Sequence, residues 1–281
     1  MSHNLHGKVA VVTGGGGVLG SAFAKELARV GAKVAILNRS EDKAKKVADD
    51  IAGSGGIALA IACDVLDKAA VERAAETVKN TLGPCDILIN AAGGNHPAAI
   101  TAQEVFSQAE LGQNVVGTPT FFDMQVEGFE AVFRLNFMGT FIPSQVFLSQ
   151  MAGRPGATVI NISSMSAFAP LTKVPAYSAA KAAVSNFTQW LAVHFAEAGV
   201  RVNALAPGFF LTEQNRMLLT NPDGSYTARA EKIIAHTPMR RFGQPEDLLG
   251  TLLWLADEKA SGFVTGIVVP VDGGFMAYAG V

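Results

Sequence analysis

The sequence predicts an α/β fold in which a doubly wound parallel sheet of about seven strands has helices on both faces. Short apolar runs alternate with longer amphipathic stretches, and most of the apolar runs are nearly continuous, which is typical of strands buried on both faces. Gly31, Gly83 and Gly199 each stand between a helical stretch and the next apolar run, where glycine commonly ends a helix.

The elements follow from this alternation in chain order. The expected strands are 9–12, 33–37, 57–61, 87–89, 158–162, 201–205 and 267–269. The expected helices are 18–30, 41–53, 67–82, 128–151, 176–198 and 245–256. Asp67 is a plausible N-cap for the third helix. No linker, repeat or low-complexity tract marks a second domain, so we expect one domain over residues 1–281.

Composition excludes several classes of protein. The 281 residues are 49% hydrophobic and 16% charged, which excludes a disordered chain. Two cysteines are too few for the disulfide framework of a secreted module in a chain this long. The formal net charge is −2 with no basic stripe, so no nucleic-acid partner is expected. The uncharged runs are broken by polar residues, glycine or proline, and no apolar stretch precedes the first strand. We therefore expect a cytoplasmic protein with no membrane partner.

Two long segments interrupt the alternation, at 93–127 and 209–242. Both follow expected strands, so both should leave the carboxyl edge of the sheet, where open α/β folds bind ligands. We interpret the first as a substrate-loop insertion, over about 94–127, with a short helix at 102–109. The second is interpreted as a substrate lid with a short helix around 227–235.

A glycine-rich turn joins the first expected strand to the first helix. Glycine lets the backbone approach a ligand closely, and a helix N-terminus attracts a pyrophosphate. This context favours a dinucleotide site over a simple tight turn, and no Lys-Ser/Thr pair follows that would indicate a nucleoside-triphosphate loop. The cofactor candidates in this turn are Gly14, Gly16, Gly17, Val18 and Leu19.

Further cofactor candidates follow the next three strands. Asn38 and Arg39 stand where an acidic residue would bind the ribose of NAD, so this position favours NADP(H), with NAD(H) still possible. The alternative for Arg39 is a solvated side chain. Asp64 and Val65 follow the third strand, where Asp64 either contacts the adenine or caps a turn. Asn90, Ala91 and Gly93 follow the fourth, where Asn90 can also support the sheet.

Tyr177 and Lys181 lie one turn apart on one face of an expected helix. A phenol with a pKa near 10 is a poor acid or base at neutral pH, and a neighbouring ammonium group stabilises its ionised form. Ser164, at the end of the fifth strand, can supply a hydroxyl that orients a substrate carbonyl. A tyrosine and a lysine at this spacing are common by chance, but the small residues around them indicate a closely packed site.

Together these motifs resemble the short-chain dehydrogenase/reductase family over nearly the whole chain. The further matches are Asn136, Pro207 with Gly208 and Thr212, and the C-terminal run 272–274. The resemblance implies a Rossmann-type fold, a nicotinamide cofactor, and Asn136, Ser164, Tyr177 and Lys181 as catalytic residues. In that family Tyr177 would exchange a proton with the substrate oxygen, and Lys181 would lower its pKa. One departure is Val18, where the family pattern has glycine.

Within the family, the chain is similar to short-chain-type D-mannonate oxidoreductases, or fructuronate reductases, and more loosely to gluconate 5-dehydrogenases. This similarity implies a sugar-acid substrate. Its candidate contacts are Asn95, His96, Ser166, Lys173, Asn215 and Arg216. The alternatives are another carbonyl reductase, acting on polyols or β-ketoacyl groups, and a non-catalytic dinucleotide sensor. No cluster of residues has the spacing of a metal site.

The similarity also implies a homotetramer, because related enzymes pair the helices expected here at 128–151 and 176–198. The second of these helices carries more large apolar surface than one sheet face needs, from Phe187, Trp190, Leu191 and Phe195.

Overall fold

The computed structural model describes residues 5–111, 119–211 and 216–280. Its strands are β1 (Val9–Thr13), β2 (Lys33–Asn38), β3 (Ile57–Ala62), β4 (Ile87–Asn90), β5 (Thr158–Ile162), β6 (Arg201–Pro207) and β7 (Val268–Val271). All neighbouring strands are parallel, in the order β3-β2-β1-β4-β5-β6-β7. The order reverses between β1 and β4, which is the crevice where ligands bind in doubly wound sheets. The predicted fold class and all predicted strands are confirmed.

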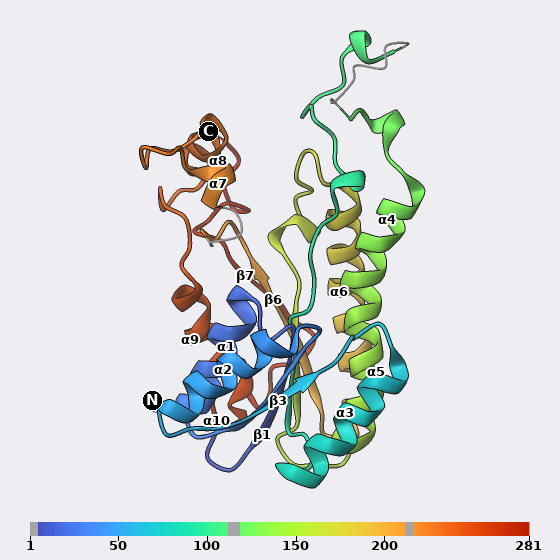
Figure 1. Cartoon of the computed structure of the whole chain (residues 1–281), viewed down its shortest axis with the longest axis vertical. Coiled ribbons are helices and arrows are strands. Elements are labelled where there is room, and N and C mark those ends of the chain that lie inside the picture. The colour runs from blue at the N-terminus through green and yellow to red at the C-terminus, as the bar shows by residue number, and fades with distance from the viewer. Residues whose placement is uncertain (1–4, 112–118, 212–215, 281) are drawn as a thin grey trace.

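Helices cover both faces of the sheet (Figure 1). The helices are α1 (Val18–Arg29), α2 (Glu41–Gly53), α3 (Lys68–Thr81), α4 (Val126–Phe133), α5 (Gly139–Met151), α6 (Pro175–His194), α7 (Arg216–Leu219), α8 (Ala228–His236), α9 (Leu249–Ala256) and α10 (Glu258–Ser261). On one face α1, α2 and α9 bury an apolar cluster that includes Phe23 and Leu252. On the other face α3, α5 and α6 bury a second cluster that includes Phe147 and Leu191. Burial of these two apolar surfaces against one sheet holds the layers together.

The local signals for helix ends are also confirmed. The Asp67 carboxylate accepts hydrogen bonds from the backbone N–H groups of Ala69 and Ala70, at the start of α3. Gly31, Gly83 and Gly199 have φ of 96°, 113° and 73°. These left-handed positions turn the chain from a helix into the following strand.

The helix expected over 128–151 is observed, but a wider turn interrupts its regular α-helical hydrogen bonding. Residues Arg134–Met138 form a π-helical turn between α4 and α5. Pro143, inside α5, has no backbone N–H to donate to the preceding turn. The wide turn contains Asn136, and such turns frequently mark functional positions.

The helix expected at 102–109 is wrong. Its backbone is engaged by other segments, because the N–H of Thr101 donates to the Lys173 carbonyl at 3.1 Å and that of Ala102 donates to the Pro119 carbonyl at 2.7 Å. The described part of the insertion contains three short 3₁₀ turns instead, at Pro97–Ala99, Gln108–Glu110 and Phe121–Asp123. The helix expected around 227–235 is confirmed as α8.

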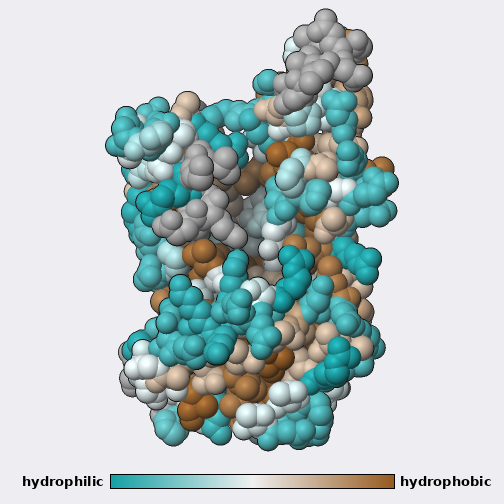
Figure 2. Space-filling view, in the orientation of Figure 1, coloured by the Kyte–Doolittle hydropathy of each residue, from teal (hydrophilic) through white to brown (hydrophobic). Residues whose placement is uncertain are grey.

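The two long segments extend beyond the sheet as separate lobes, with α7 and α8 on one side and the insertion and α4 on the other (Figure 1). The molecule is hollowed between these lobes (Figure 2). Within the described ranges, no helix combines the length and the apolar character needed to span a membrane.

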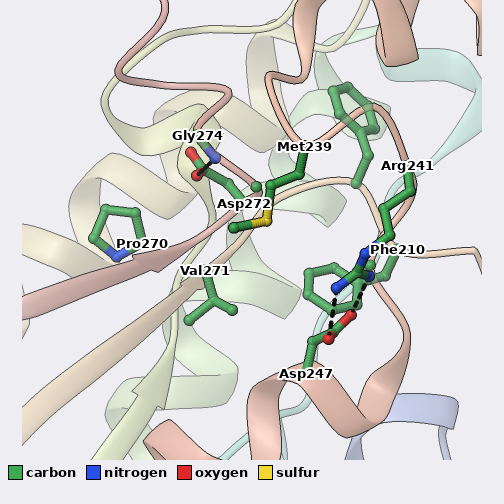
Figure 3. Close-up of a pocket in the computed structure, with 11 residues that line it drawn as sticks. Phe210, Met239, Arg241, Asp247, Pro270, Val271, Asp272 and Gly274 are labelled. Atoms are coloured by element: carbon green, nitrogen blue, oxygen red, sulfur yellow. Dashed lines mark hydrogen bonds and ion pairs between the residues drawn. The ribbon is translucent and has the colours of Figure 1, made fainter.

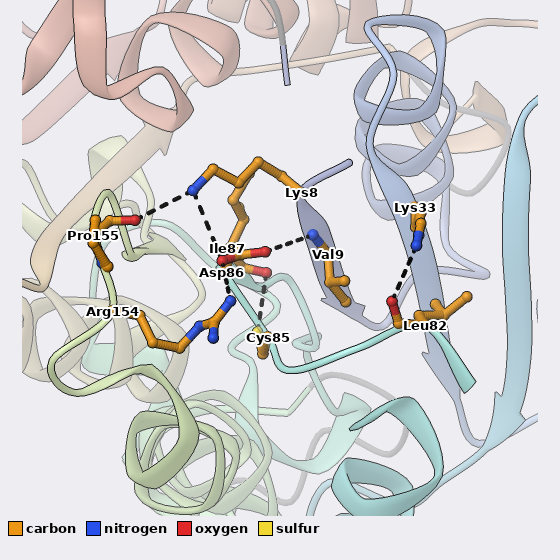
Figure 4. Close-up of polar contacts among 9 residues, drawn as sticks. All are labelled: Lys8, Val9, Lys33, Leu82, Cys85, Asp86, Ile87, Arg154 and Pro155. Carbon is orange, nitrogen blue, oxygen red and sulfur yellow. Dashed lines mark hydrogen bonds and ion pairs between the residues drawn. The ribbon is translucent and has the colours of Figure 1, made fainter. Parts of the chain in front are cut away.

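At the opposite end of the sheet, a buried carboxylate joins three segments (Figure 4). Asp86, just before β4, accepts from the backbone N–H of Val9 at 2.9 Å and from Arg154 Nη2 at 2.8 Å. The Lys8 ammonium group lies 3.8 Å from the same carboxylate. Asp86 is 5% exposed, so these contacts form in a region of low solvation.

We expect Asp86→Ala to lower the free energy of unfolding by about 2–4 kcal/mol, because it leaves a buried N–H and a guanidinium group without their acceptor. Chemical denaturation measures the loss. As a matched control, Asp50→Ala removes the exposed ion pair with Lys25 and should change stability little. Equal stability of the two variants would contradict this role for Asp86.

Candidate active site

A cavity of about 610 Å³ lies at the carboxyl edge of the sheet, and residues that follow each of the first six strands line it. Of the cofactor-binding candidates, all but Asn90 and Thr212 line this cavity: Gly14, Gly16, Gly17, Val18, Leu19, Asn38, Arg39, Asp64, Val65, Ala91, Gly93, Tyr177, Lys181, Pro207 and Gly208. Thr212 lies outside the described residues. The cavity therefore brings together side chains from six separate segments of the sequence.

The glycine-rich turn packs tightly beneath the cavity. Gly14 has φ of 63°, and a Cβ there would lie 2.8 Å from the Cα of Ala92. The hydroxyl of Thr13 accepts hydrogen bonds from the backbone N–H groups of Ala91 and Ala92, which joins this turn to the end of β4. Only glycine fits this close approach between the two loops.

The N-terminus of α1 opens onto the same cavity. Gly17 is the N-cap, no side chain caps the helix, and its first turn has no acidic residue. The backbone N–H groups and the positive end of the helix dipole are therefore available to an anion such as a pyrophosphate. Val18 begins the helix and lines the cavity, so the turn accommodates this departure from the family pattern.

One end of the cavity is cationic. Asn38, which donates to the Ser40 carbonyl at 3.0 Å, lies there beside Arg39. Lys43, in the first turn of α2, lines the same end. Lys43 is not among the residues predicted from the sequence. The sequence feature that could have indicated Lys43 is its position four residues after Arg39, at the start of the next helix.

Tyr177, Lys181 and Ser164 converge at the other end of the cavity. The Lys181 ammonium group lies 5.6 Å from the centre of the Tyr177 ring and donates to the Ile162 carbonyl at 2.8 Å. The Ser164 hydroxyl lies near enough to the Tyr177 phenol to favour its ionised form. The Tyr177 ring also packs beside Ala99 of the insertion and Val132 of α4.

Burial dominates the acid–base properties of these two groups. It raises the pKa of the Tyr177 phenol, against a lowering by the hydrogen bond with Ser164. Burial lowers the pKa of Lys181 from 10.5 to about 8. We expected Lys181 to lower the pKa of Tyr177, but in this structure burial raises that pKa.

Asn136 lies in the wide turn between α4 and α5 and is fully buried. Its Nδ2 donates to the carbonyls of Gly94 and Val132, at 2.7 and 2.8 Å, and its Oδ1 accepts from the Gly94 N–H at 3.3 Å. The Asn136 side chain is therefore bonded to both the carbonyl and the N–H of Gly94, at the start of the insertion. It does not itself line the cavity.

Two of the cofactor candidates have structural contacts of their own. Asn90 donates to Ser144 Oγ and Asn161 Oδ1, both at 2.9 Å, inside the core, so its side chain supports the sheet. Asp64 accepts from the Leu66 N–H at 2.9 Å and also lines the cavity. For Asp64, both interpretations of the sequence therefore apply.

The substrate candidates are not gathered around the cavity. Asn95 accepts from the His96 N–H, and His96 Nδ1 accepts from the Ala98 N–H, so both stabilise a turn at the root of the insertion. Ser166 is buried, and its Oγ has no hydrogen-bond partner. Lys173 stands before α6, Arg216 is exposed at the start of α7, and Asn215 lies outside the described residues.

The C-terminal run 272–274 lines a second cavity, of about 380 Å³ (Figure 3). The Asp272 carboxylate accepts from the backbone N–H groups of Gly274 and Met276, and a Cβ on Gly208 would lie 2.6 Å from its Cα. Arg241 in this cavity is paired with both oxygens of Asp247, at 2.6 and 2.9 Å. The C-terminal run thus supports the Pro207–Gly208 turn from behind.

Comparison with known proteins identifies the family. A family profile described as short chain dehydrogenase matches residues 8–222. The chain belongs to this family. A Bacillus subtilis (strain 168) protein called uncharacterized oxidoreductase UxuB is 60% identical over 281 residues, which are 100% of this chain and 99% of that protein. The 7alpha-hydroxysteroid dehydrogenase of Escherichia coli K12 is 32% identical over 96% of this chain and 94% of its own.

A solved structure is also similar to this short-chain dehydrogenase. It is a Haemophilus influenzae protein with the provisional name D-mannonate oxidoreductase and with bound NAD. The two share 52% sequence identity and a TM-score of 0.95, over 99% of this chain and 98% of the other. The resemblance inferred from sequence motifs is confirmed, and the protein is an NAD(P)-dependent dehydrogenase/reductase.

The cavity fits the nicotinamide cofactor that the family uses. The uncapped helix N-terminus suits the pyrophosphate, and the glycine turn leaves room for it. When bound, the nicotinamide ring supplies the hydride chemistry. The Ser164 hydroxyl can hold a carbonyl oxygen beside the Tyr177 phenol, which can pass a proton to that oxygen. In the described residues no group of histidine, cysteine and carboxylate side chains is placed to hold a metal.

We expect Tyr177→Phe to lower turnover by about a hundred- to ten-thousandfold, because the variant keeps the ring and loses the transferable proton. Cofactor affinity should stay within about twofold, measured by fluorescence titration. Tyr278→Phe, near the C-terminus, is the matched control with unchanged turnover. Wild-type rates in Tyr177→Phe would refute the assignment.

Proposed function

We propose that this short-chain dehydrogenase transfers a hydride between its nicotinamide cofactor and a sugar acid, D-fructuronate or D-mannonate, in the cytoplasm. The supporting observation is the similarity to the Haemophilus influenzae protein that has the provisional name D-mannonate oxidoreductase. This similarity covers 99% of the chain and therefore includes the long insertion. Tyr177 would exchange the proton with the substrate oxygen and Ser164 would orient that oxygen. Lys181 and Asn136 would hold the cofactor and the proton path.

The contacts of the insertion support a role at the substrate. Its root is held by catalytic candidate Asn136 through Gly94, and its Ala99 packs beside the Tyr177 ring. The glutamines and asparagines of the insertion predict a polar surface, but its outer part exposes apolar side chains. There Phe106, Phe121 and Phe122 are more than half exposed and contact one another edge to face. We propose that the inner part closes over substrate and that this outer part contacts a neighbouring subunit.

The test is a panel of sugar acids, polyols and β-ketoacyl substrates, assayed with NADH and NADPH or with the oxidised cofactors. We expect the highest kcat/KM for D-fructuronate reduction, because the family similarity extends through the substrate-loop insertion. A higher value for a polyol or a β-ketoacyl thioester would assign the enzyme to another carbonyl reductase class. Cofactor binding with no turnover on the whole panel would indicate a dinucleotide sensor.

For the cofactor we propose a preference for NADP(H). Asn38 brings no negative charge to repel a 2′-phosphate, and Arg39 and Lys43 line the same end of the cavity. The Haemophilus influenzae relative carries NAD, so the two cofactors must be compared directly. We expect Arg39→Ala to weaken NADPH binding about ten- to a hundredfold and NADH binding less than twofold, by fluorescence titration. Equal losses would indicate an NAD site with a solvated arginine.

We propose a homotetramer whose subunits meet along α5 and α6. Phe137 and Phe141 contact Phe187, and Trp190 stacks on Phe187 and His194 along the outside of these helices. Trp190 is 56% exposed, a large apolar surface to leave in water. Light scattering at micromolar concentration should give four subunits, and Trp190→Glu should give smaller species. A wild-type monomer would contradict the proposal.

A further inference from the structure

The substrate-loop insertion and the substrate lid meet through opposite charges. Glu104 of the insertion forms an ion pair with Lys232 of α8, although 128 residues separate them in sequence. The pair spans the two lobes that rise on either side of the hollow in Figure 2. Among the described residues, this ion pair joins the two long segments.

Two further cations act on this pair. Besides the hydrogen bond from Lys232, which contributes most, Lys173 and Arg229 help to lower the pKa of the Glu104 carboxyl. Three positive groups near one negative group attract a second anion, or the same anion in exchange. The insertion therefore supplies a carboxylate to a cluster that is cationic without it.

The lysines of this cluster are carried by segments that adjoin the cavity, although neither lysine lines it. Lys173 precedes Tyr177 by four residues, and its backbone is fixed with φ of 71° while its carbonyl accepts from the Thr101 N–H at 3.1 Å. The helix α8, which carries Lys232, packs through Ala230 and Ile233 beside Phe209. Phe209 in turn lines the cavity. On the lid side the connection therefore runs through the apolar face of α8, and on the other side through the start of α6.

We propose that Lys232 and Lys173 bind the carboxylate of the substrate, and that Glu104 occupies this subsite until the substrate displaces it. This inference rests on the proposed sugar-acid function. In it, Lys232 is a specificity-determining residue and Glu104 is an internal competitor. A neutral sugar has no carboxylate with which to replace Glu104.

Kinetics with a charged and a neutral ketose tests the proposal. Lys232→Met should raise KM for D-fructuronate about ten- to a hundredfold and change that for D-fructose less than twofold. Glu104→Gln should lower KM for D-fructuronate several-fold and leave D-fructose unchanged. The matched controls are Lys259→Met on α10, at the opposite end of the molecule (Figure 1), and Glu72→Gln, which removes the exposed ion pair with Lys68 on α3. Both should match the wild type.

If the Glu104–Lys232 ion pair only stabilises the contact between the two segments, the kinetics will differ from this expectation. Both variants would then change KM for the two ketoses by the same factor, and that outcome overturns the proposal. An increased KM for D-fructuronate in Glu104→Gln overturns it as well.

Calorimetry separates this inference from the proposed function. D-gluconate and neutral sorbitol are titrated into the enzyme with oxidised cofactor. Tighter gluconate binding by Glu104→Gln and weaker binding by Lys232→Met, with sorbitol unaffected, uphold the subsite even if no sugar acid is turned over. Absence of such differences in an enzyme that does reduce D-fructuronate rejects the subsite and leaves the proposed function standing.

Discussion

The ammonium group of Lys181 is buried at the carboxyl edge of the sheet, where its exposed fraction is 3% and it donates to the carbonyl at the end of β5. The arrangement around it follows from that position. Tyr177 lies one turn earlier on α6, and Gly93 must be glycine, because a Cβ there would lie 3.2 Å from the ammonium nitrogen and 2.7 Å from Asn136 Oδ1. The carboxyl ends of β4 and β5 can approach the first turns of α6 this closely only because a small residue, Gly93, stands between them. A buried cation is costly in stability, and here it lies where a nicotinamide enzyme uses one.

The two long segments add specificity to this shared framework. Asn136 fixes the insertion at its root, and Glu104 meets the lid at Lys232. The strands and glycine turns determine where the cofactor lies, whereas contacts between loops determine which substrate can enter. Members of the family can therefore share this framework and differ in substrate. One relative is named 7alpha-hydroxysteroid dehydrogenase, whereas a sugar acid is proposed for this chain.

Sequence patterns predicted the features that depend on short-range physics. Continuous apolar runs predicted the strands, and the glycine turn and the Tyr177–Lys181 spacing predicted which residues face the cavity. The errors involve contacts between distant segments. The region 102–109 has helix-compatible composition, but its backbone bonds to Lys173 and Pro119, which no local pattern shows. The wide turn at Asn136, the paired Arg241 and the meeting of Glu104 with Lys232 also depend on tertiary packing. For Asn90 the sequence left two roles open, and its hydrogen bonds to Ser144 and Asn161 show the structural one.

The most direct test of the central claim, that this protein buries a cation at its active site at the expense of stability, is the pH dependence of unfolding. The folded-state pKa of Lys181 is lowered from 10.5 to about 8, so the burial cost is fully present below pH 8 and is relieved as pH rises toward 10.5. The free energy of unfolding of the cofactor-free enzyme and of Lys181→Met should be measured by urea denaturation from pH 7 to 10. We predict that Lys181→Met is the more stable by up to about 3 kcal/mol at pH 7, and that the difference shrinks steadily above pH 8. A wild type at least as stable as the variant at pH 7, with a difference independent of pH, would contradict the account.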